Sequence, residues 1–357
     1  MLLFSNIKKY LLQGNIYFDH IDIIHHTNNI VVINPYSLQN YVLDLPTNII
    51  YYYNGQPKIE RWHKNGKLHR EGDLPAYIEY YGNGQLFMER WHKNGKLHRE
   101  GDLPAFIQYE ENGQPKIQIW LKNGERHREG DLPAQIKYYD YGQLDNKIWY
   151  KNGKKHREGD LPAEIEYYFS DGQPKIQIWY KNGELHREGD LPAEIEYYFN
   201  GQLKAQTWCE GGKLHREGDL PAEIYYYENR LPKTQMWYQN GELHREGDLP
   251  AAIKYYEGGQ LDKETWYKNG IKHRDGDLPA EIFYYKNGRP EIEKWYQNGI
   301  KHRDGDLPAE IFYDKNGRLE IEKWYQNDKW YREGGLPDEI YYFTTGITKY
   351  KDGIKLS

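Results

Sequence analysis

The residues best suited to chemistry lie in a recurring block, His-Arg-Glu/Asp-Gly-Asp-Leu-Pro-Ala, which is first complete at 69–76. An imidazole and a carboxylate two residues apart are groups that bind divalent metal ions. The arginine and the aspartate can form ion pairs, while glycine and proline suit a sharp corner of the backbone. The block contains nine of the 14 histidines, which are His69, His98, His127, His156, His186, His215, His244, His273 and His302.

A metal ion shared between neighbouring blocks is not expected. Repeats of two or more strands place equivalent histidines about 10 Å or more apart, whereas the ligands of one ion lie about 2 Å from it. We therefore expect a structural corner in which glycine takes an unusual backbone conformation, aspartate bonds a turn amide and arginine pairs with acids of the next repeat. A metal-loaded array is the less favoured alternative, and elemental analysis of the purified protein would test it.

A second group of possible ligands precedes the blocks, at Asp19, His20, Asp22, His25 and His26. Solvated polar residues around a short strand explain this group more simply than a metal site does. The sequence therefore leads us to assign no metal or cofactor to the chain.

No combination of residues typical of an enzyme is present. Catalysis needs several different side chains at one place, whereas a repeated surface offers no unique pocket, and neither a phosphate-binding loop nor a nucleophile motif occurs. Cys209 occupies a position that holds Tyr in most repeats and His63, His92 or Leu121 in others. A position with such varied occupants is expected to be exposed. We predict that the protein is not an enzyme.

The nine histidines are separated by steps of 29 residues, with one step of 30. A fixed period of this length is the signature of a repeat array, in which each unit is too small to fold alone and packs against its neighbours. The single longer step lies in 168–172, at a turn, where an insertion costs little. A tryptophan column keeps the same period, at Trp62, Trp91, Trp120, Trp149, Trp179, Trp208, Trp237, Trp266, Trp295 and Trp324.

Each repeat predicts short antiparallel strands and no helix. Glycine-containing turns recur too often to leave room for a helix of ordinary length, and the segment 193–197 alternates as a strand does. We expect two or three strands in each repeat. The fold class is all-β: an elongated array of about ten 29-residue antiparallel β-hairpin repeats with caps at both ends.

The caps are predicted where the period fails. Residues 1–47 form an N-terminal cap, with strand candidates at 16–18 and 30–33; residues 48–338 form the repeat array and residues 339–357 a C-terminal cap.

The repeat-structural residues are the ten tryptophans together with Leu74, Pro75, Leu191 and Pro192. Because Leu191 is counted with the core and Arg187 with an exposed ion-pair ladder, we expect the Leu191 substitution to destabilise more than the Arg187 substitution. The tryptophans could instead stack on sugars or single-stranded bases, but nucleic acid would also require a basic groove beside them, and none is evident.

Composition limits the partners and the compartment. The net charge of −6 is spread over interleaved acids and bases, so neither nucleic acid nor a membrane surface is expected as a main partner. With one cysteine, Cys209, no internal disulfide can form, and an intracellular, reducing compartment fits best. The N-terminal segment does not have the pattern of a secretory signal, and no apolar run approaches the length of a membrane span.

The pattern Tyr-Tyr-x-Asn-Gly-Gln-Leu-x(4)-Trp, carried by residues such as Tyr197, Tyr198, Gly201, Leu203 and Trp208, resembles the MORN-type hairpin repeat. It is more similar to the variant found in bacterial antitoxin-like proteins and in repeat proteins of giant DNA viruses, and the Asn-, Ile-, Lys- and Tyr-rich usage agrees with such a viral origin. The resemblance covers roughly two-thirds of each repeat, because the His-Arg-Glu-Gly-Asp-Leu-Pro-Ala block departs from the general pattern. It implies a β-hairpin sheet, a scaffolding or interaction role and no catalytic residues.

The sequence therefore predicts a non-enzymatic scaffold that presents a repetitive, tyrosine-rich face of mixed charge to unidentified protein partners. The alternative is a MORN-like assembly protein apposed to a membrane.

Overall fold

The computed structural model describes residues 22–26, 29–33 and 40–356, with side chains from residue 44 onward. The first described strands form a three-stranded antiparallel sheet in the order β1 (Asp22–His26), β2 (Asn29–Ile33) and β3 (Asn40–Leu43). The strand expected at 30–33 is confirmed within β2. The strand expected at 16–18 and the residues Asp19 and His20 lie outside the described residues, as do the side chains of Asp22, His25 and His26.

Each repeat consists of four strands rather than the two or three expected. In the repeat around Trp208, β24 (Glu194–Tyr197) and β25 (Leu203–Thr207) form the main hairpin. The two-residue strands β26 (Cys209–Glu210) and β27 (Lys213–Leu214) form a side hairpin beside it. The number of strands was underestimated because strands of two residues are too short to show alternation of apolar and polar side chains.

The main hairpins are built from two strand types. The four-residue strands are β4 (Asn48–Tyr51), β8 (Tyr77–Tyr80), β12 (Phe106–Tyr109), β16 (Gln135–Tyr138), β20 (Glu164–Tyr167), β24, β28 (Glu223–Tyr226), β32 (Ala252–Tyr255), β36 (Glu281–Tyr284) and β40 (Glu310–Tyr313). The five-residue strands are β5 (Pro57–Arg61), β9 (Leu86–Arg90), β13 (Pro115–Ile119), β17 (Leu144–Ile148), β21 (Pro174–Ile178), β25, β29 (Pro232–Met236), β33 (Leu261–Thr265), β37 (Pro290–Lys294) and β41 (Leu319–Lys323).

The side hairpins pair two-residue strands. They are β6 (His63–Lys64) with β7 (Lys67–Leu68), β10 (His92–Lys93) with β11 (Lys96–Leu97), β14 (Leu121–Lys122) with β15 (Glu125–Arg126), β18 (Tyr150–Lys151) with β19 (Lys154–Lys155), β22 (Tyr180–Lys181) with β23 (Glu184–Leu185), β26 with β27, β30 (Tyr238–Gln239) with β31 (Glu242–Leu243), β34 (Tyr267–Lys268) with β35 (Ile271–Lys272), β38 (Tyr296–Gln297) with β39 (Ile300–Lys301), and β42 (Tyr325–Gln326) with β43 (Lys329–Trp330).

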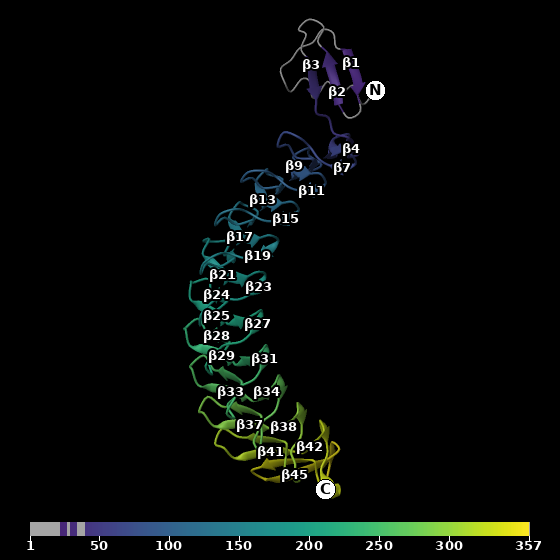
Figure 1. Cartoon of the computed structure of the whole chain (residues 1–357). Coiled ribbons are helices and arrows are strands. Elements are labelled where there is room, and N and C mark those ends of the chain that lie inside the picture. The colour runs from purple at the N-terminus through teal and green to yellow at the C-terminus, as the bar shows by residue number, and fades with distance from the viewer. Residues whose placement is uncertain (1–21, 27–28, 34–39, 357) are drawn as a thin grey trace. The chain divides into compact units, whose positions relative to one another are not determined.

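The chain divides into two compact units, Met1–Glu125 with Asp140–Gly142, and Arg126–Tyr139 with Gln143–Ser357. In the first unit the antiparallel pairings run β4–β5–β8–β9–β12–β13. In the second unit the pairings run hairpin after hairpin in chain order from β16, and Figure 1 shows these hairpins side by side. Two strands about 4.8 Å apart are added with each repeat, so each repeat advances the ladder by about 10 Å.

The array of repeated antiparallel hairpins and the all-β class are confirmed. Among the described residues the only helical segment is a three-residue 3₁₀ turn, η1 (Glu333–Gly335). No helix in this described part of the chain has the length and apolar character needed to cross a membrane.

The ladder ends at β44 (Glu339–Phe343), β45 (Gly346–Lys351) and β46 (Ile354–Lys355), which pair in that order. Asp338 stands just before them, at the position that holds alanine in the preceding repeats, and its carboxylate accepts a hydrogen bond from the Asp352 N–H. These three strands lie within 339–357, where the 29-residue period of the sequence fails.

The core is thin and is built by the block and the tryptophan column. The ten tryptophans are 5–7% exposed, and the alanine that closes each complete block is 0% exposed. Backbone hydrogen bonds join the two: the Trp208 N–H donates to the Ala222 carbonyl (2.7 Å) and the His215 N–H to the Trp208 carbonyl (3.2 Å). The same backbone bond is kept where the closing residue is Asp338, whose carbonyl accepts from the Trp324 N–H (2.9 Å).

The longer step of 30 residues is absorbed at a turn, as expected. The Gly172 N–H donates to the Tyr168 carbonyl four residues back, whereas the equivalent Gly201 N–H donates to the Tyr198 carbonyl three residues back. The strand register on either side is the same as in the other repeats, with Glu164 opposite Ile178 and Tyr167 opposite Pro174.

Candidate functional site

The block forms a corner around its arginine. The Arg216 guanidinium lies on the Trp208 ring, 3.8 Å from the ring centroid, and donates to the Pro221 carbonyl (3.4 Å). Its other two donors reach both carboxylate oxygens of Asp190 in the preceding block, at 2.7 and 2.8 Å. A planar guanidinium suits this position because it stacks on an aromatic face while it binds a carboxylate with two parallel hydrogen bonds.

This set of contacts of one arginine with a tryptophan ring and an aspartate, called the arginine lock, is repeated along the chain. It joins each repeat to the preceding one rather than to the next one. The arginine side chains are 13–18% exposed and lie 2.5–3.0 Å from their aspartates. The pairs are Arg70–Asp44, Arg99–Asp73, Arg157–Asp131, Arg187–Asp160, Arg216–Asp190, Arg245–Asp219, Arg274–Asp248, Arg303–Asp277 and Arg332–Asp306.

The arginine lock depends on the charge of the aspartate. The hydrogen bonds from Arg216 lower the pKa of Asp190, and those from Arg187 lower the pKa of Asp160 in the same way. The aspartate also contributes backbone, because the Trp237 indole N–H donates to the Asp219 carbonyl at 3.2 Å. The corner that contains Asp219 therefore holds the next one through both its side chain and its backbone, and the same indole contact is made by Trp62, Trp91, Trp266 and Trp324.

The leucine and the proline of the block have different environments. Leu74 is 43% exposed and Leu191 is 44% exposed, whereas Pro75 and Pro192 are buried. The expectation that Leu191 belongs to the core is therefore wrong, and so is the expectation that Arg187 is exposed, since its side chain is 13% exposed. The physical reason is the stacking on tryptophan, which buries the long aliphatic stem and the weakly hydrated guanidinium of arginine.

The tryptophan column is a core feature and not a stacking platform. The Trp179 ring is 6% exposed and is covered by the Arg187 guanidinium at 3.9 Å. Sugars or bases would have to displace that guanidinium in order to stack on the ring. The alternative of a stacking surface for nucleic acid therefore has no support in the geometry.

The outer surface of a typical corner carries a second, weaker group of charges. The Glu71 carboxylate accepts from the Lys64 ammonium (2.7 Å) and lies 2.9 Å from the His69 Nε2 atom. These two hydrogen bonds, that of Lys64 first, lower the pKa of Glu71 to about 2. The Glu71 side chain is 73% exposed, so the group is available to solvent and to partners.

Clefts lie between successive corners in the second unit. One of about 300 Å³ is bounded by the block that begins at His156 and the block that begins at His186, with Leu161 at its wall. Another, of about 550 Å³, is bounded by the blocks that begin at His273 and His302, with Leu278 and Leu307 in its lining. The clefts recur because the corners recur, and each one is walled by exposed leucine and by charged side chains.

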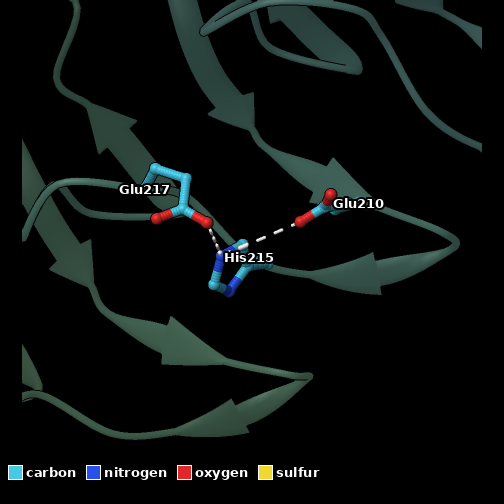
Figure 2. A group of neighbouring side chains, drawn as sticks. All are labelled: Glu210, His215 and Glu217. Carbon is cyan, nitrogen blue, oxygen red and sulfur yellow. Dashed lines mark hydrogen bonds and ion pairs between the residues drawn. The ribbon is translucent and has the colours of Figure 1, made fainter.

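One corner differs from the others and groups three possible metal ligands. The His215 Nε2 atom lies 3.2 Å from a carboxylate oxygen of Glu217 and 3.9 Å from one of Glu210 (Figure 2). The ligand atoms of the three residues all lie within 4.8 Å of one another. Histidines of different repeats are not brought together in this group, in agreement with the spacing argument. Glu210 was missed by the sequence analysis, although it is visible as a carboxylate at a position that holds Lys or Gln in the other repeats.

The Cys209 thiol is 8% exposed, so the expectation of an exposed position is wrong. Burial, with smaller contributions from Glu194 and Glu223, raises the pKa of Cys209 to about 11. A buried thiol with such a pKa is almost entirely protonated at neutral pH and is a poor nucleophile. The other occupants of this position, such as His63, His92 and Leu121, are half-buried.

The turn ends of the main hairpins, which lie away from the tryptophans and are called the tyrosine edge, carry an inter-repeat contact that the sequence analysis did not identify. The Tyr198 hydroxyl donates to the Tyr226 carbonyl of the next repeat (2.7 Å), and the Tyr227 hydroxyl donates to the Tyr255 carbonyl (2.8 Å). The same contact is made by Tyr52, Tyr81, Tyr139, Tyr168, Tyr256 and Tyr285. The second tyrosine of each Tyr-Tyr pair was visible in the sequence, but its partner is a backbone atom, which a side-chain pattern does not reveal.

Comparison with known proteins gives no family for this chain. No family model matches it, and no curated protein matches it. Among solved structures, CbpJ from Streptococcus pneumoniae TIGR4 is similar at 13% identity, with 95% of this chain and 98% of that chain covered and a TM-score of 0.15. A TM-score of this size carries no argument about fold or function.

Proposed function

We propose that the protein is a non-enzymatic repeat scaffold that binds protein partners along its row of corners. The observation that carries this proposal is the exposed leucine of the block, which recurs at one position in every repeat at 40–46% exposure, as Leu74, Leu103, Leu132, Leu161, Leu191, Leu220, Leu249, Leu278, Leu307 and Leu336. Within each unit this gives apolar contacts about one repeat, or about 10 Å, apart, each flanked by an exposed carboxylate. Such a row suits an extended or repetitive partner, whose weak contacts combine through avidity.

The partner is expected to be a protein because each corner offers an apolar side chain beside a charged group and a cleft. A highly basic surface, which nucleic acid would require, does not fit the overall charge of −6. The buried tryptophans and the buried Cys209 thiol support neither a stacking platform nor a nucleophile. We propose an intracellular, reducing location on the basis of the single, free cysteine.

The family that we propose is the MORN type, in the variant of antitoxin-like and giant-virus repeat proteins. The motif that carries the resemblance folds as an antiparallel hairpin from β24 to β25, with Asn200 and Gly201 in the turn and Trp208 after the second strand. This agreement concerns the hairpin alone, and the corner block adds a feature outside the general MORN pattern.

The scaffold proposal is tested by changing the leucines while the fold is retained. Leu220, Leu249 and Leu278 would be replaced together by serine, and partner capture from the native host would be compared with that of the parent chain by quantitative mass spectrometry. Loss of the partners that the parent chain captures supports the proposal, whereas unchanged capture contradicts it. The matched control is Phe199→Ser, which removes a residue of 58% exposure from the tyrosine edge of the same unit and should retain capture.

A second candidate, assembly against a membrane, is favoured by apolar aromatic residues at the turn tips of the tyrosine edge. Phe169 is 47% exposed and Phe199 is 58% exposed, each packed edge-on against a tyrosine. Co-sedimentation with neutral and anionic liposomes tests it. Pelleting that Phe199→Ser abolishes would support the membrane role, and the absence of pelleting with either lipid would remove it.

A further inference from the structure

The corner at His215 is distinguished by the residue that faces its histidine from the side hairpin. In the other repeats this position holds lysine (Lys64, Lys93, Lys122, Lys151, Lys181 and Lys268) or glutamine (Gln239, Gln297 and Gln326). A lysine there neutralises the carboxylate that follows the histidine, as the 2.5 Å contact between Lys181 and Glu188 illustrates. Glu210 instead places a second carboxylate beside His215 and Glu217, so this corner has two anions and no lysine to neutralise them.

Six other corners hold their histidines in a tautomer that carries the proton on Nε2, so that Nε2 has no free lone pair for a metal. The backbone N–H of Asn269 donates to the His244 Nδ1 atom (3.2 Å), and that of Asn298 donates to the His273 Nδ1 atom (3.3 Å). A neutral imidazole that accepts at Nδ1 carries its proton on Nε2, which then donates to the neighbouring carboxylate. The same bond is made to His69, His98, His127 and His156.

His215 is released from this constraint. Its Nδ1 atom is buried and has no hydrogen-bond partner among the described residues, so the proton can occupy Nδ1 and leave Nε2 with a free lone pair. The Nδ1 atom of His302 has the same freedom. At His302, however, the position of Glu210 is occupied by Gln297 and only Asp304 supplies a carboxylate, 2.9 Å from the ring. Among the described corners, His215 alone combines the free ring nitrogen with two carboxylates.

We propose that Glu210, His215 and Glu217 form a binding site for one divalent transition-metal ion, of the class of Zn²⁺. The three ligand atoms lie within 4.8 Å of one another, and the two glutamate side chains are 70% and 89% exposed and can turn inward to reach bond lengths of about 2.0–2.2 Å. One nitrogen and two carboxylate oxygens leave a fourth position for water or for a ligand from a partner.

The donor set indicates the choice and strength of binding. An imidazole with carboxylates favours Zn²⁺ and its transition-metal neighbours over Mg²⁺ or Ca²⁺, which prefer oxygen ligands alone. Metal-bound histidines usually donate their second N–H to an acceptor, and His215 has none among the described residues, so we expect micromolar rather than nanomolar affinity for Zn²⁺. The ion would replace lysine as the cation that neutralises the corner.

The test is calorimetric titration of ZnCl₂ into the metal-free, untagged full chain and into its Glu210→Lys variant. Lysine is the native residue at this position in six other repeats, so the variant should fold, and circular dichroism checks that it does. The other histidines contribute equally to both proteins. We expect the parent chain to bind one equivalent more than the variant, with affinity at this site lowered at least about 100-fold by the substitution, since a ligand is lost and a positive charge gained. Equal stoichiometry in the two proteins overturns the proposal.

Two further variants test whether the free ring nitrogen is required. Gln297→Glu gives His302, whose Nδ1 is unpartnered, a second carboxylate and should add one equivalent of Zn²⁺. Gln239→Glu makes the same change beside His244, whose Nδ1 accepts the Asn269 N–H, and should add none. A gain in the first variant alone supports the proposal, whereas a gain in both or in neither contradicts the requirement for a free Nδ1 on which it depends.

Discussion

Neighbouring repeats are held together by different contacts at the two ends of the main hairpins, the corner edge, where the blocks lie, and the tyrosine edge. At the corner edge, Arg187 joins Trp179 of its own repeat to Asp160 of the preceding one through stacking and charge. At the tyrosine edge, the neutral Tyr198 hydroxyl donates to the Tyr226 carbonyl of the following repeat. We therefore expect the contact at the corner edge, which joins two charged groups, to weaken when its aspartate is protonated, whereas the contact at the tyrosine edge joins a hydroxyl to a backbone carbonyl. In this array, one contact between neighbouring repeats depends on charge and the other does not.

Acidification should produce the largest effect, because it acts on every corner at once. The pKa of Asp160 and of Asp190 in the folded chain lies below the value in the unfolded chain, so the unfolded state binds protons first as the pH falls. The contribution of these groups is therefore complete above about pH 4 and is lost as the pH falls through the lowered folded values. We expect little change in urea stability between pH 7 and 5 and a steep loss below about pH 4, followed by tryptophan fluorescence.

The double variant Asp160→Asn/Asp190→Asn tests whether the corner aspartates cause this loss of stability at low pH. Two corners of this variant no longer titrate, so its stability at pH 7 should be lower and its loss of stability below pH 4 should be shallower than in the parent chain. A pH profile parallel to that of the parent chain would assign the acid response to other carboxylates.

The next largest effect is expected at a single arginine. Arg187→Ala removes the guanidinium from the Trp179 ring and leaves Asp160 without its partner, which should lower the free energy of unfolding by about 2 kcal/mol. Leu191→Ala, at a residue of 44% exposure, should cost about 0.5 kcal/mol or less. Urea denaturation at pH 7 measures both. An equal or larger loss of unfolding free energy in Leu191→Ala would contradict this prediction and agree with the expectation from the sequence alone, in which Leu191 contributes more to stability than Arg187.

Arg187→Lys sharpens the same comparison. Lysine keeps the charge but loses the planar stacking and the paired hydrogen bonds to Asp160. We expect it to recover less than half of the stability lost in Arg187→Ala.

Arg187 and Leu191 also show how far the sequence predicts this molecule. The 29-residue period predicts the hairpin array, and the insertion at 168–172 is placed correctly in a turn, because both depend on local turn chemistry. The burial of Arg187 depends on the Trp179 ring and on an aspartate 27 residues earlier, so residue type alone gives the wrong order of burial. Glu210 could have been found by aligning the repeats with one another. The free Nδ1 of His215 could not, because it depends on the geometry of a backbone N–H.

A smaller effect than that of Arg187→Ala is expected at the tyrosine edge. Tyr198→Phe keeps the ring and removes only the hydroxyl that donates to the Tyr226 carbonyl at 2.7 Å, so it should lower the free energy of unfolding by about 1 kcal/mol. Because no charge is involved, the loss should be the same at pH 7 and pH 5 and in low and high salt, measured by urea denaturation. Phe199→Tyr is the matched control, since it adds a hydroxyl at an adjacent residue of 58% exposure and should leave stability unchanged. A loss at Tyr198 that varied with salt would mean that the two edges are coupled, so that a neutral contact on one side of a repeat would depend on the arginine lock on the other.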